Sequence, residues 1–303
     1  MINNKCELLP YIREDLHGLS PDDPQTLGWE IKKLGVDKQW SKSRGAGVVV
    51  AVIDTGCDTQ HPDIKNNVVG GYDFIKNKSE VIDRNGHGSH VCGTIAGEDN
   101  GVGMVGVAPQ AKILALKALN DNGSGRMDHI AKAIKYAADH GADIITMSLG
   151  SGYKCPRIEK SIEYAEKKKC LIFCAAGNSG ADVDIMYPAK FKKTFSIGAI
   201  DKNFNRGSFT CSGDSLDFLS PGVDIMSIVP NNKYALMTGT SMSNPFASGV
   251  AALYLSEYKE KNNGARMSMQ EMMSKLKKNA IPLANKSFNS RKYQGFGIIK
   301  PIL

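Results

Sequence analysis

The sequence GVVVAVIDTG occupies residues 47–56 and decides which fold we expect for this chain. Its first seven residues form a continuous apolar, largely β-branched run, which is typical of a strand buried on both faces. Apolar runs of the same length recur at residues 112–119, 142–149, 170–176 and 194–200. Between them, residues 127–140 and 157–169 repeat apolar positions every three to four residues, which predicts amphipathic helices.

Strands that alternate with helices in this way form βαβ units. We therefore expect an α/β protein of three layers, with a mainly parallel central sheet covered by helices on both faces. Further helices are predicted after residue 242 and over 268–278.

Composition excludes several functional classes. The chain has 303 residues, of which 42% are hydrophobic and 23% charged, as in ordinary globular proteins. No apolar run approaches the roughly 18 residues that a membrane span requires, so we expect no membrane partner. The net charge is +7, but no aromatic residues interleave with the lysine runs, so we expect no nucleic-acid partner. Whether the chain forms a homodimer is left open by the sequence.

The seven cysteines indicate a reducing compartment. Their number is odd and their spacing does not resemble a disulfide framework. The N-terminus also lacks a basic region followed by an apolar stretch, so no secretory signal is expected. We therefore predict a cytoplasmic location. Cys170 and Cys174 bracket an apolar run, and we interpret them as buried structural thiols rather than metal ligands.

Two motifs at and after the end of this first strand contain side chains suited to catalysis. Asp54 stands at its C-terminal end, where open α/β sheets carry functional groups, although Asp-Thr-Gly is also a common turn. His87 and His90 lie three residues apart at the start of a helix of small residues. Helical zinc motifs space two histidines four apart around a glutamate, so we favour a catalytic His87 and a structural His90.

Two more motifs complete a constellation of four. Asn178 follows a buried strand in a glycine-framed loop, where its amide either donates to an oxyanion or caps the turn. Ser241 lies on a Gly-Thr-Ser-Met-Ser turn before a run of small residues. Asp54, His87, Asn178 and Ser241 are thus each expected at the edge of one sheet.

At this point the chain resembles the subtilisin-like serine proteases, through VAVIDTGCDTQHPD, NGHGSHVCGTIAG, GVAP, MSLG, AAGNSG, YPAK, SPG and GTSMSNP in that order. The resemblance implies a subtilisin-like three-layer fold and a serine endopeptidase acting on polypeptide substrates. It implies Ser241 as nucleophile, His87 as base, Asp54 as its orienting acid and Asn178 as oxyanion donor. The substrate would lie against Gly123, Ser124, Gly125, Ser148, Leu149, Gly150, Ala176 and Gly177.

The resemblance also implies a structural calcium ion. Side-chain oxygens would come from Asp63 and Asn100, and main-chain oxygens from Glu98, Val102 and Met104, while Gln25 would complete the shell. Such hard oxygen ligands suit Ca²⁺, although an acidic turn without metal is the alternative.

The N-terminal ELLPY (7–11) resembles the short leader of the intracellular subtilisins. We therefore predict an inhibitory leader over residues 1–23 and a catalytic domain over 24–303. Leu8, Leu9, Pro10 and Tyr11 would lie across the cleft like a substrate, and Pro10 would distort the backbone there because it has no N–H. A mobile tail is the alternative.

Three positions depart from the family pattern around the nucleophile, namely Ser243, Asn244 and Phe246. Asp182 and Asp184, in a shortened loop, suggest a preference for a basic residue before the cut bond. Two other functions stay open: a dedicated processing protease with one target, and an inactive binding module with the same fold.

Overall fold

A central parallel sheet confirms the predicted α/β class. The computed structural model of the chain describes residues 5–283 and 288–303, so the first four residues of the predicted leader lie outside it. The strand order is β11 (Phe218–Pro221), β10 (Phe195–Ile200), β9 (Leu171–Ala175), β7 (Ile144–Met147), β3 (Val49–Asp54), β5 (Lys112–Lys117) and β4 (Val68–Asp73), with every neighbouring pair parallel. Nearly all of β3 is buried, which explains its unbroken apolar sequence.

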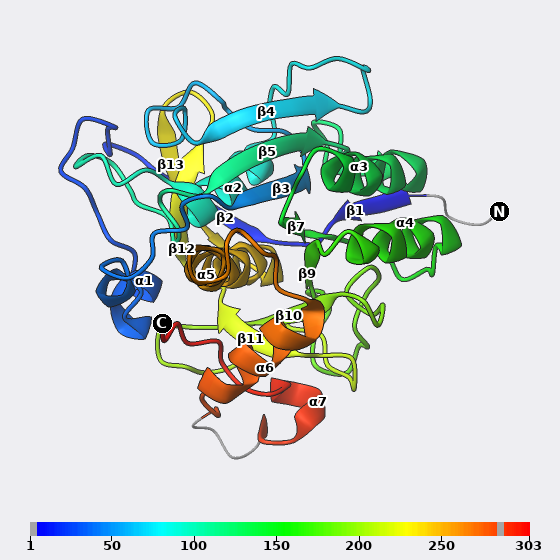
Figure 1. Cartoon of the computed structure of the whole chain (residues 1–303). Helices are drawn as coiled ribbons and strands as arrows, with labels where there is room; N and C mark the ends of the chain where they lie inside the picture. The colour runs from blue at the N-terminus through cyan, green and yellow to red at the C-terminus, as the bar shows by residue number, and fades with distance from the viewer. Residues whose placement is uncertain (1–4, 284–287) are drawn as a thin grey trace.

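Helices cover both faces of this sheet (Figure 1). On one face α2 (His87–Ala96) packs on the long α5 (Thr240–Lys261), and on the other α3 (Met127–Asp139) packs on α4 (Pro156–Lys167). Within the described ranges, further helical segments are α1 (Trp29–Leu34), a 3-10 turn at Asp37–Gln39, α6 (Met269–Asn279) and α7 (Arg291–Gln294). The three-layer prediction is therefore confirmed.

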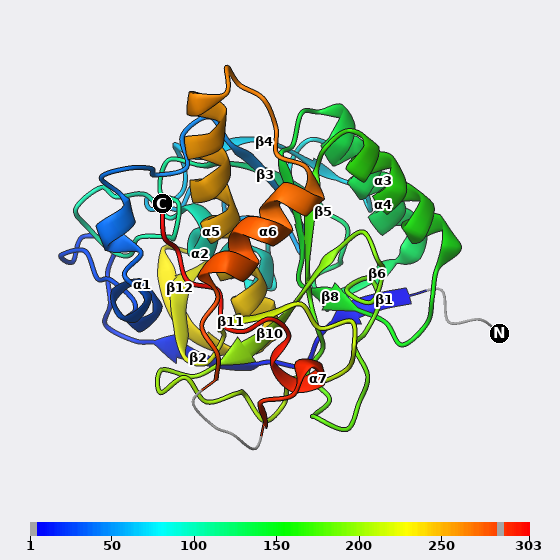
Figure 2. The same cartoon turned by 60° about the horizontal axis from the view of Figure 1, so that its bottom comes forward.

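Two small antiparallel sheets each take a strand from the N-terminal segment. In the first, β1 (Lys5–Leu8) lies between β6 (Ser124–Arg126) and β8 (Leu149–Gly150). In the second, β2 (Ile12–Leu16) pairs with β13 (Lys233–Thr238), which pairs in turn with β12 (Ile225–Val229). Figure 2 shows the segment from β1 to β2 running across one side of the molecule.

The predicted strand over 142–149 is thus two strands, because the chain leaves the central sheet after Met147 and β8 joins the small sheet of β1. Across residues 5–283 and 288–303, no helix has the length and apolar character needed to cross a membrane.

Candidate active site

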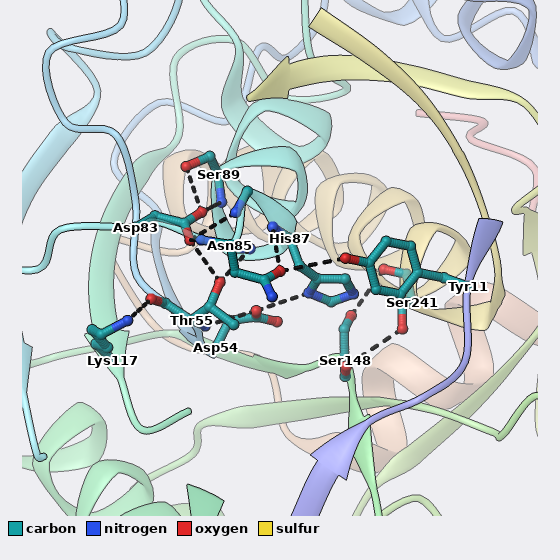
Figure 3. Close-up of polar contacts among 12 residues, drawn as sticks. Tyr11, Asp54, Thr55, Asp83, Asn85, His87, Ser89, Lys117, Ser148 and Ser241 are labelled. Carbon is teal, nitrogen blue, oxygen red and sulfur yellow. Dashed lines mark hydrogen bonds and ion pairs between the residues drawn. The ribbon is translucent and has the colours of Figure 1, made fainter. Parts of the chain in front are cut away.

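Asp54 and His87 meet at the C-terminal end of β3 (Figure 3). Nδ1 of His87 lies 2.8 Å from Oδ1 of Asp54, and both side chains are fully buried. The helix that carries His87 lies very close to the turn after β3, since a Cβ atom on Gly88 would lie 2.2 Å from the main-chain oxygen of Gly56. Glycine at residue 88 therefore permits the contact between the imidazole and the carboxylate.

Ser241 stands in the first turn of α5 and is fully buried. Its Oγ donates a long hydrogen bond of 3.4 Å to the main-chain oxygen of Ser148. Nε2 of His87 has no hydrogen-bond partner among the described residues. The hydrogen bond at Nδ1 therefore fixes the orientation of the imidazole, and Nε2 is available to accept a proton from a hydroxyl group.

Asn178 follows β9, and its amide is held in one orientation. Its Oδ1 accepts hydrogen bonds from N (2.9 Å) and Oγ1 (2.7 Å) of Thr240, the residue before Ser241. Its Nδ2 donates a 2.6 Å hydrogen bond to the main-chain oxygen of Pro10. The amide N–H is thus directed at a carbonyl oxygen of an extended chain, beside the serine.

The structure therefore brings together the four side chains that the sequence singled out. A carboxylate fixes one imidazole nitrogen, and the other nitrogen has no partner in the part of the chain that the structure describes. A serine hydroxyl and an amide donor lie at the same edge of the sheet. This set of groups is suited to nucleophilic attack on a carbonyl carbon.

Asp83 is a residue of this site that the sequence did not single out. The buried Asp83 carboxylate accepts five hydrogen bonds, drawn in Figure 3: Oδ1 from Thr55 Oγ1 (2.9 Å), Asn85 N (3.0 Å) and Gly86 N (2.9 Å), and Oδ2 from Ser89 N (2.8 Å) and Ser89 Oγ (2.7 Å). The chain thus wraps around one carboxylate on both sides of His87. An aspartate shortly before a helix start is a capping signal, and it could have identified Asp83.

Thr55 connects Asp83 to the Asp54–His87 pair. Its main-chain N donates to Oδ1 of Asp54 at 2.7 Å, while its Oγ1 donates to Asp83 and accepts from Gly88 N at 2.9 Å. Displacing Asp83 would therefore disturb both members of the Asp54–His87 contact.

The N-terminal segment covers this site. Tyr11 lies over the imidazole of His87, with 5.0 Å between the ring centroids, and its hydroxyl donates to Oδ1 of Asn85 at 3.3 Å. Burial raises the pKa of Tyr11, and the carboxylates of Asp54 and Asp83 raise it further, against the opposite effect of Arg13.

Five of the eight expected substrate contacts hold the N-terminal segment in the structure. Leu8 N donates to the oxygen of Gly123 at 2.8 Å, and the segment pairs with Ser124, Gly125, Leu149 and Gly150. Ser148 instead contacts Ser241, while Ala176 and Gly177 connect β9 to Asn178.

Leu9 is 2% exposed and fills the space above Gly150. A Cβ atom on Gly150 would lie 2.5 Å from Cδ2 of Leu9 and 3.3 Å from Sδ of Met186, and one on Gly177 would lie 3.1 Å from Cγ of Met186. Asp184 is paired with Lys190 and does not offer a free charge to Leu9. Met186 was not anticipated from the sequence.

The six residues expected to bind calcium also gather in one place. Asp63 is fully buried, and its Oδ2 accepts from Met104 N (2.8 Å) and from the hydroxyl of Tyr234 (2.8 Å). Nδ2 of Asn100 lies 3.4 Å from the other carboxylate oxygen. Gln25, Glu98 and Val102 lie at the same place. Gln25 donates to the oxygen of Glu98 at 2.9 Å, and Pro24 forms a β-bridge with Val102.

His90 has the structural surroundings that we predicted. Its Nε2 lies 2.9 Å from the oxygen of Ile225, and burial lowers its pKa to about 3. Among the unusual residues near Ser241, Phe246 is fully buried and Asn244 donates to Oγ1 of Thr146 at 2.7 Å. Ser243 donates to the oxygen of Thr240 at 3.0 Å, so all three pack behind the nucleophile rather than in front of it.

Comparison with known proteins is consistent with this geometry. The model of the subtilase family matches residues 45–297. The major intracellular serine protease of Bacillus subtilis (strain 168) is 36% identical over 292 residues, covering 93% of this chain and 90% of that protein. An intracellular serine protease of Paenibacillus polymyxa is 40% identical, over 89% and 83% of the two chains. Subtilisin DY of Bacillus licheniformis is 38% identical, over 91% and 97%.

Proposed function

The chain belongs to the subtilase family and is a serine endopeptidase, and from this premise we propose that Asp54, His87 and Ser241 are its catalytic triad, with Asn178 as oxyanion donor. The observation that carries the proposal is the 2.6 Å hydrogen bond from Asn178 to a main-chain carbonyl oxygen, beside a serine and an oriented imidazole. A scissile carbonyl in that place would have its oxygen against the donor.

The geometry supports the following roles. Ser241 Oγ attacks the carbonyl carbon while Nε2 of His87 accepts its proton, and the same imidazole later gives that proton to the leaving amine. Asp54 keeps the second imidazole nitrogen as the N–H and stabilises the imidazolium. Asn178 Nδ2 and the main-chain N–H of Ser241 donate to the oxyanion of the tetrahedral intermediate.

We further propose that residues 1–23 keep the enzyme latent. In productive binding, one residue both fills the pocket before the cut bond and presents its carbonyl to the oxyanion donor. In the leader, Leu9 fills the space above Gly150, but the carbonyl at Asn178 belongs to Pro10. The leader is thus one residue out of register, and the reacting atoms lack the alignment that attack requires.

The same contacts support a preference for an aliphatic residue before the cut bond. Leu9 occupies the space bounded by Gly150 and Met186, and the nearby Asp184 is paired with Lys190. We therefore propose leucine-sized side chains as the preferred fit.

The calcium site is also a proposal, and the residues fit the ion by their chemistry. One buried carboxylate, two amides and three main-chain carbonyls come from the loop over 98–104 and the residues bonded to it, and their oxygens are hard ligands. When bound, the ion would supply positive charge opposite Asp63 and cross-link the loop over 98–104 to residue 25. The side chain of Glu98 is engaged with Asn66, so Glu98 would contribute its carbonyl, as expected.

A cytoplasmic location is supported by the cysteines and by the names of two relatives. All seven cysteines are free thiols, and two relatives are called intracellular proteases. Cell fractionation with an antibody against the chain tests this, and recovery in the culture medium would contradict it.

Labelling with a fluorophosphonate tests the catalytic proposal directly. Protein freed of its leader and supplied with calcium should become labelled on Ser241 and should digest casein, while Ser241→Ala should do neither. Labelling on another serine, or casein digestion by Ser241→Ala, would refute the assignment.

A further inference from the structure

Lys117 is a buried lysine next to the proposed triad. It is the last residue of β5 and is only 3% exposed. Lysine is almost never fully buried without a partner, because taking its ammonium group out of water is costly. In the central sheet Lys117 is paired in register with Asp54 on β3. A positive charge is therefore buried on the strand next to the acid of the proposed triad.

The ammonium group of Lys117 donates to two oxygens. One is the main-chain oxygen of Thr55, the residue after Asp54 (Figure 3). The other is Oδ1 of Asp121, at 2.8 Å. The hydrogen bond from Lys117 holds the pKa of Asp121 below its ordinary value. Lys117 thus fixes a main-chain carbonyl on one side and a carboxylate on the other.

Both of these bonds lead to the Asp54–His87 contact. On the first side, the main-chain N of Thr55 donates to Oδ1 of Asp54 at 2.7 Å. On the second side, the main-chain oxygen of Asp121 accepts from Nδ2 of Asn85 at 3.0 Å, and Oδ1 of Asn85 accepts from the main-chain N of His87 at 3.2 Å. Lys117 therefore connects the segment that follows the carboxylate with the segment that precedes the imidazole.

The charge of Lys117 also has two buried carboxylates near it. Asp54 and Asp83 are both buried, and both accept hydrogen bonds from Thr55, one from its main-chain N and one from its hydroxyl. Two negative charges held by one threonine in a weakly polar interior repel each other. A positive charge bonded to the same threonine offsets this repulsion.

We propose that Lys117 is a positioning residue of the active site. Its ammonium group fixes Thr55 and balances the two carboxylates, so that Asp54 and His87 keep the geometry that proton transfer requires. This inference rests on the proposed function. Because Lys117 acts through Thr55, its loss should change kcat rather than KM.

Neutral variants of Lys117 test the inference in leader-free enzyme supplied with calcium. Lys117→Gln should lower kcat by about 10² and change KM by less than about threefold, since the triad is displaced and the substrate contacts stay. Fluorophosphonate labelling carried to completion counts the active molecules, so unfolded protein does not enter the value. Lys117→Met repeats the test with an apolar side chain of similar length. Lys117→Arg restores the charge and should regain at least about tenfold of the lost kcat.

Lys259→Gln is the matched control. Lys259 donates to a main-chain oxygen, that of Gly47 at 2.9 Å, and to the buried carboxylate of Asp143 at 2.7 Å. These partners directly precede β3 and the segment leading to β7, at the end of the sheet opposite to the triad. Lys259→Gln should lower the melting temperature and leave kcat unchanged.

The outcomes separate the inference from the proposed function. If kcat per active molecule in Lys117→Gln or Lys117→Met stays within about threefold of the unaltered enzyme, Lys117 acts on stability alone and the inference is wrong. A raised KM at constant kcat would refute it as well. If the unaltered leader-free enzyme neither reacts with the fluorophosphonate nor digests casein, the proposed function itself fails.

Discussion

Asn178 donates from its amide nitrogen to the oxygen of Pro10, while its amide oxygen is held by Thr240, the neighbour of Ser241. One side chain thus joins the leader, the nucleophile helix and the end of β9. The amide N–H that we propose as the oxyanion donor is thus already occupied by a carbonyl of the same chain.

Replacing Asn178 with alanine should lower kcat of the leader-free enzyme by about 10² to 10³, the loss typical for such a donor in this class of protease, with little change in KM. Steady-state kinetics on one peptide substrate measure both. The matched control is Asn203→Ala, in an exposed loop, which should leave kcat unchanged. A change confined to KM in the Asn178 variant would contradict the role.

Deleting residues 1–23 should raise activity on casein relative to the uncut full-length chain, because Tyr11 and Pro10 no longer cover the site. Pro10→Ala in the full chain should shorten the lag before activity appears, since the leader then regains an N–H and can shift register. Glu14→Ala, at an exposed position of β2, is the control. Equal activity with and without the leader would exclude self-inhibition.

Asp83→Asn should lower kcat of the leader-free enzyme by about 10², because the Asp83 carboxylate fixes Thr55 and Ser89 around the Asp54–His87 contact. Steady-state kinetics, with active sites counted by fluorophosphonate labelling, measure kcat per active molecule. A purely structural role would reduce stability without lowering this value.

Asp143→Asn is the matched control for that variant. Asp143 is equally buried and paired with Lys259 (2.7 Å) and Arg266 (2.9 Å), at the start of the strand segment leading to β7 and away from the triad. It should lower stability and leave kcat per active molecule unchanged. An unchanged kcat in Asp83→Asn would show that Asp83 acts on stability alone.

Glu30, in α1, should make the protein less stable as the pH rises. Burial raises the pKa of its carboxyl from the ordinary 4.5 to about 7. The folded state therefore binds a proton more tightly than the unfolded state, so stability falls as the pH increases from about 4.5 to about 7, by up to about 3 kcal/mol. Urea unfolding of Glu30→Gln should show a flatter pH dependence over this range, and identical slopes would disprove the effect.

Calcium should raise the melting temperature. Binding at 100 times Kd stabilises by about 2.7 kcal/mol, or roughly 5 °C for a chain of this size. A chelator should abolish this gain, and Asp63→Asn should be insensitive to the chelator. Asp201→Asn, on the loop after β10, should keep the full difference. A chelator with no effect on the unaltered chain would remove calcium from the proposal.

Much of the fold was predictable because local patterns and tertiary packing agree. The run over 47–53 corresponds to β3, and the helix predicted over 127–140 is α3 with its apolar face buried. The strands β12 and β13 were not predicted from the sequence. They pair with each other outside the central sheet, so they do not belong to the alternating strand–helix pattern on which the prediction depended.

The candidate site could be proposed from the sequence where a residue carries reactive chemistry of its own, but not where its role depends on the residues near it in space. Asp54, His87, Asn178 and Ser241 each lie in a glycine-containing motif. Asp83 and Met186 do not, because their roles arise from partners that only folding brings near, such as Ser89 for the first and Gly177 for the second.

The leader pairs with two separate sheets, and this has a consequence for how the activity of the enzyme changes with protein concentration. While the leader is covalently attached, its effective concentration at the cleft is fixed by the chain and does not change on dilution. A cut after β2 turns the leader into a separate peptide, and its rebinding becomes a second-order process. Uncut protein should therefore stay latent at any dilution, whereas cut protein should gain activity per molecule as it is diluted.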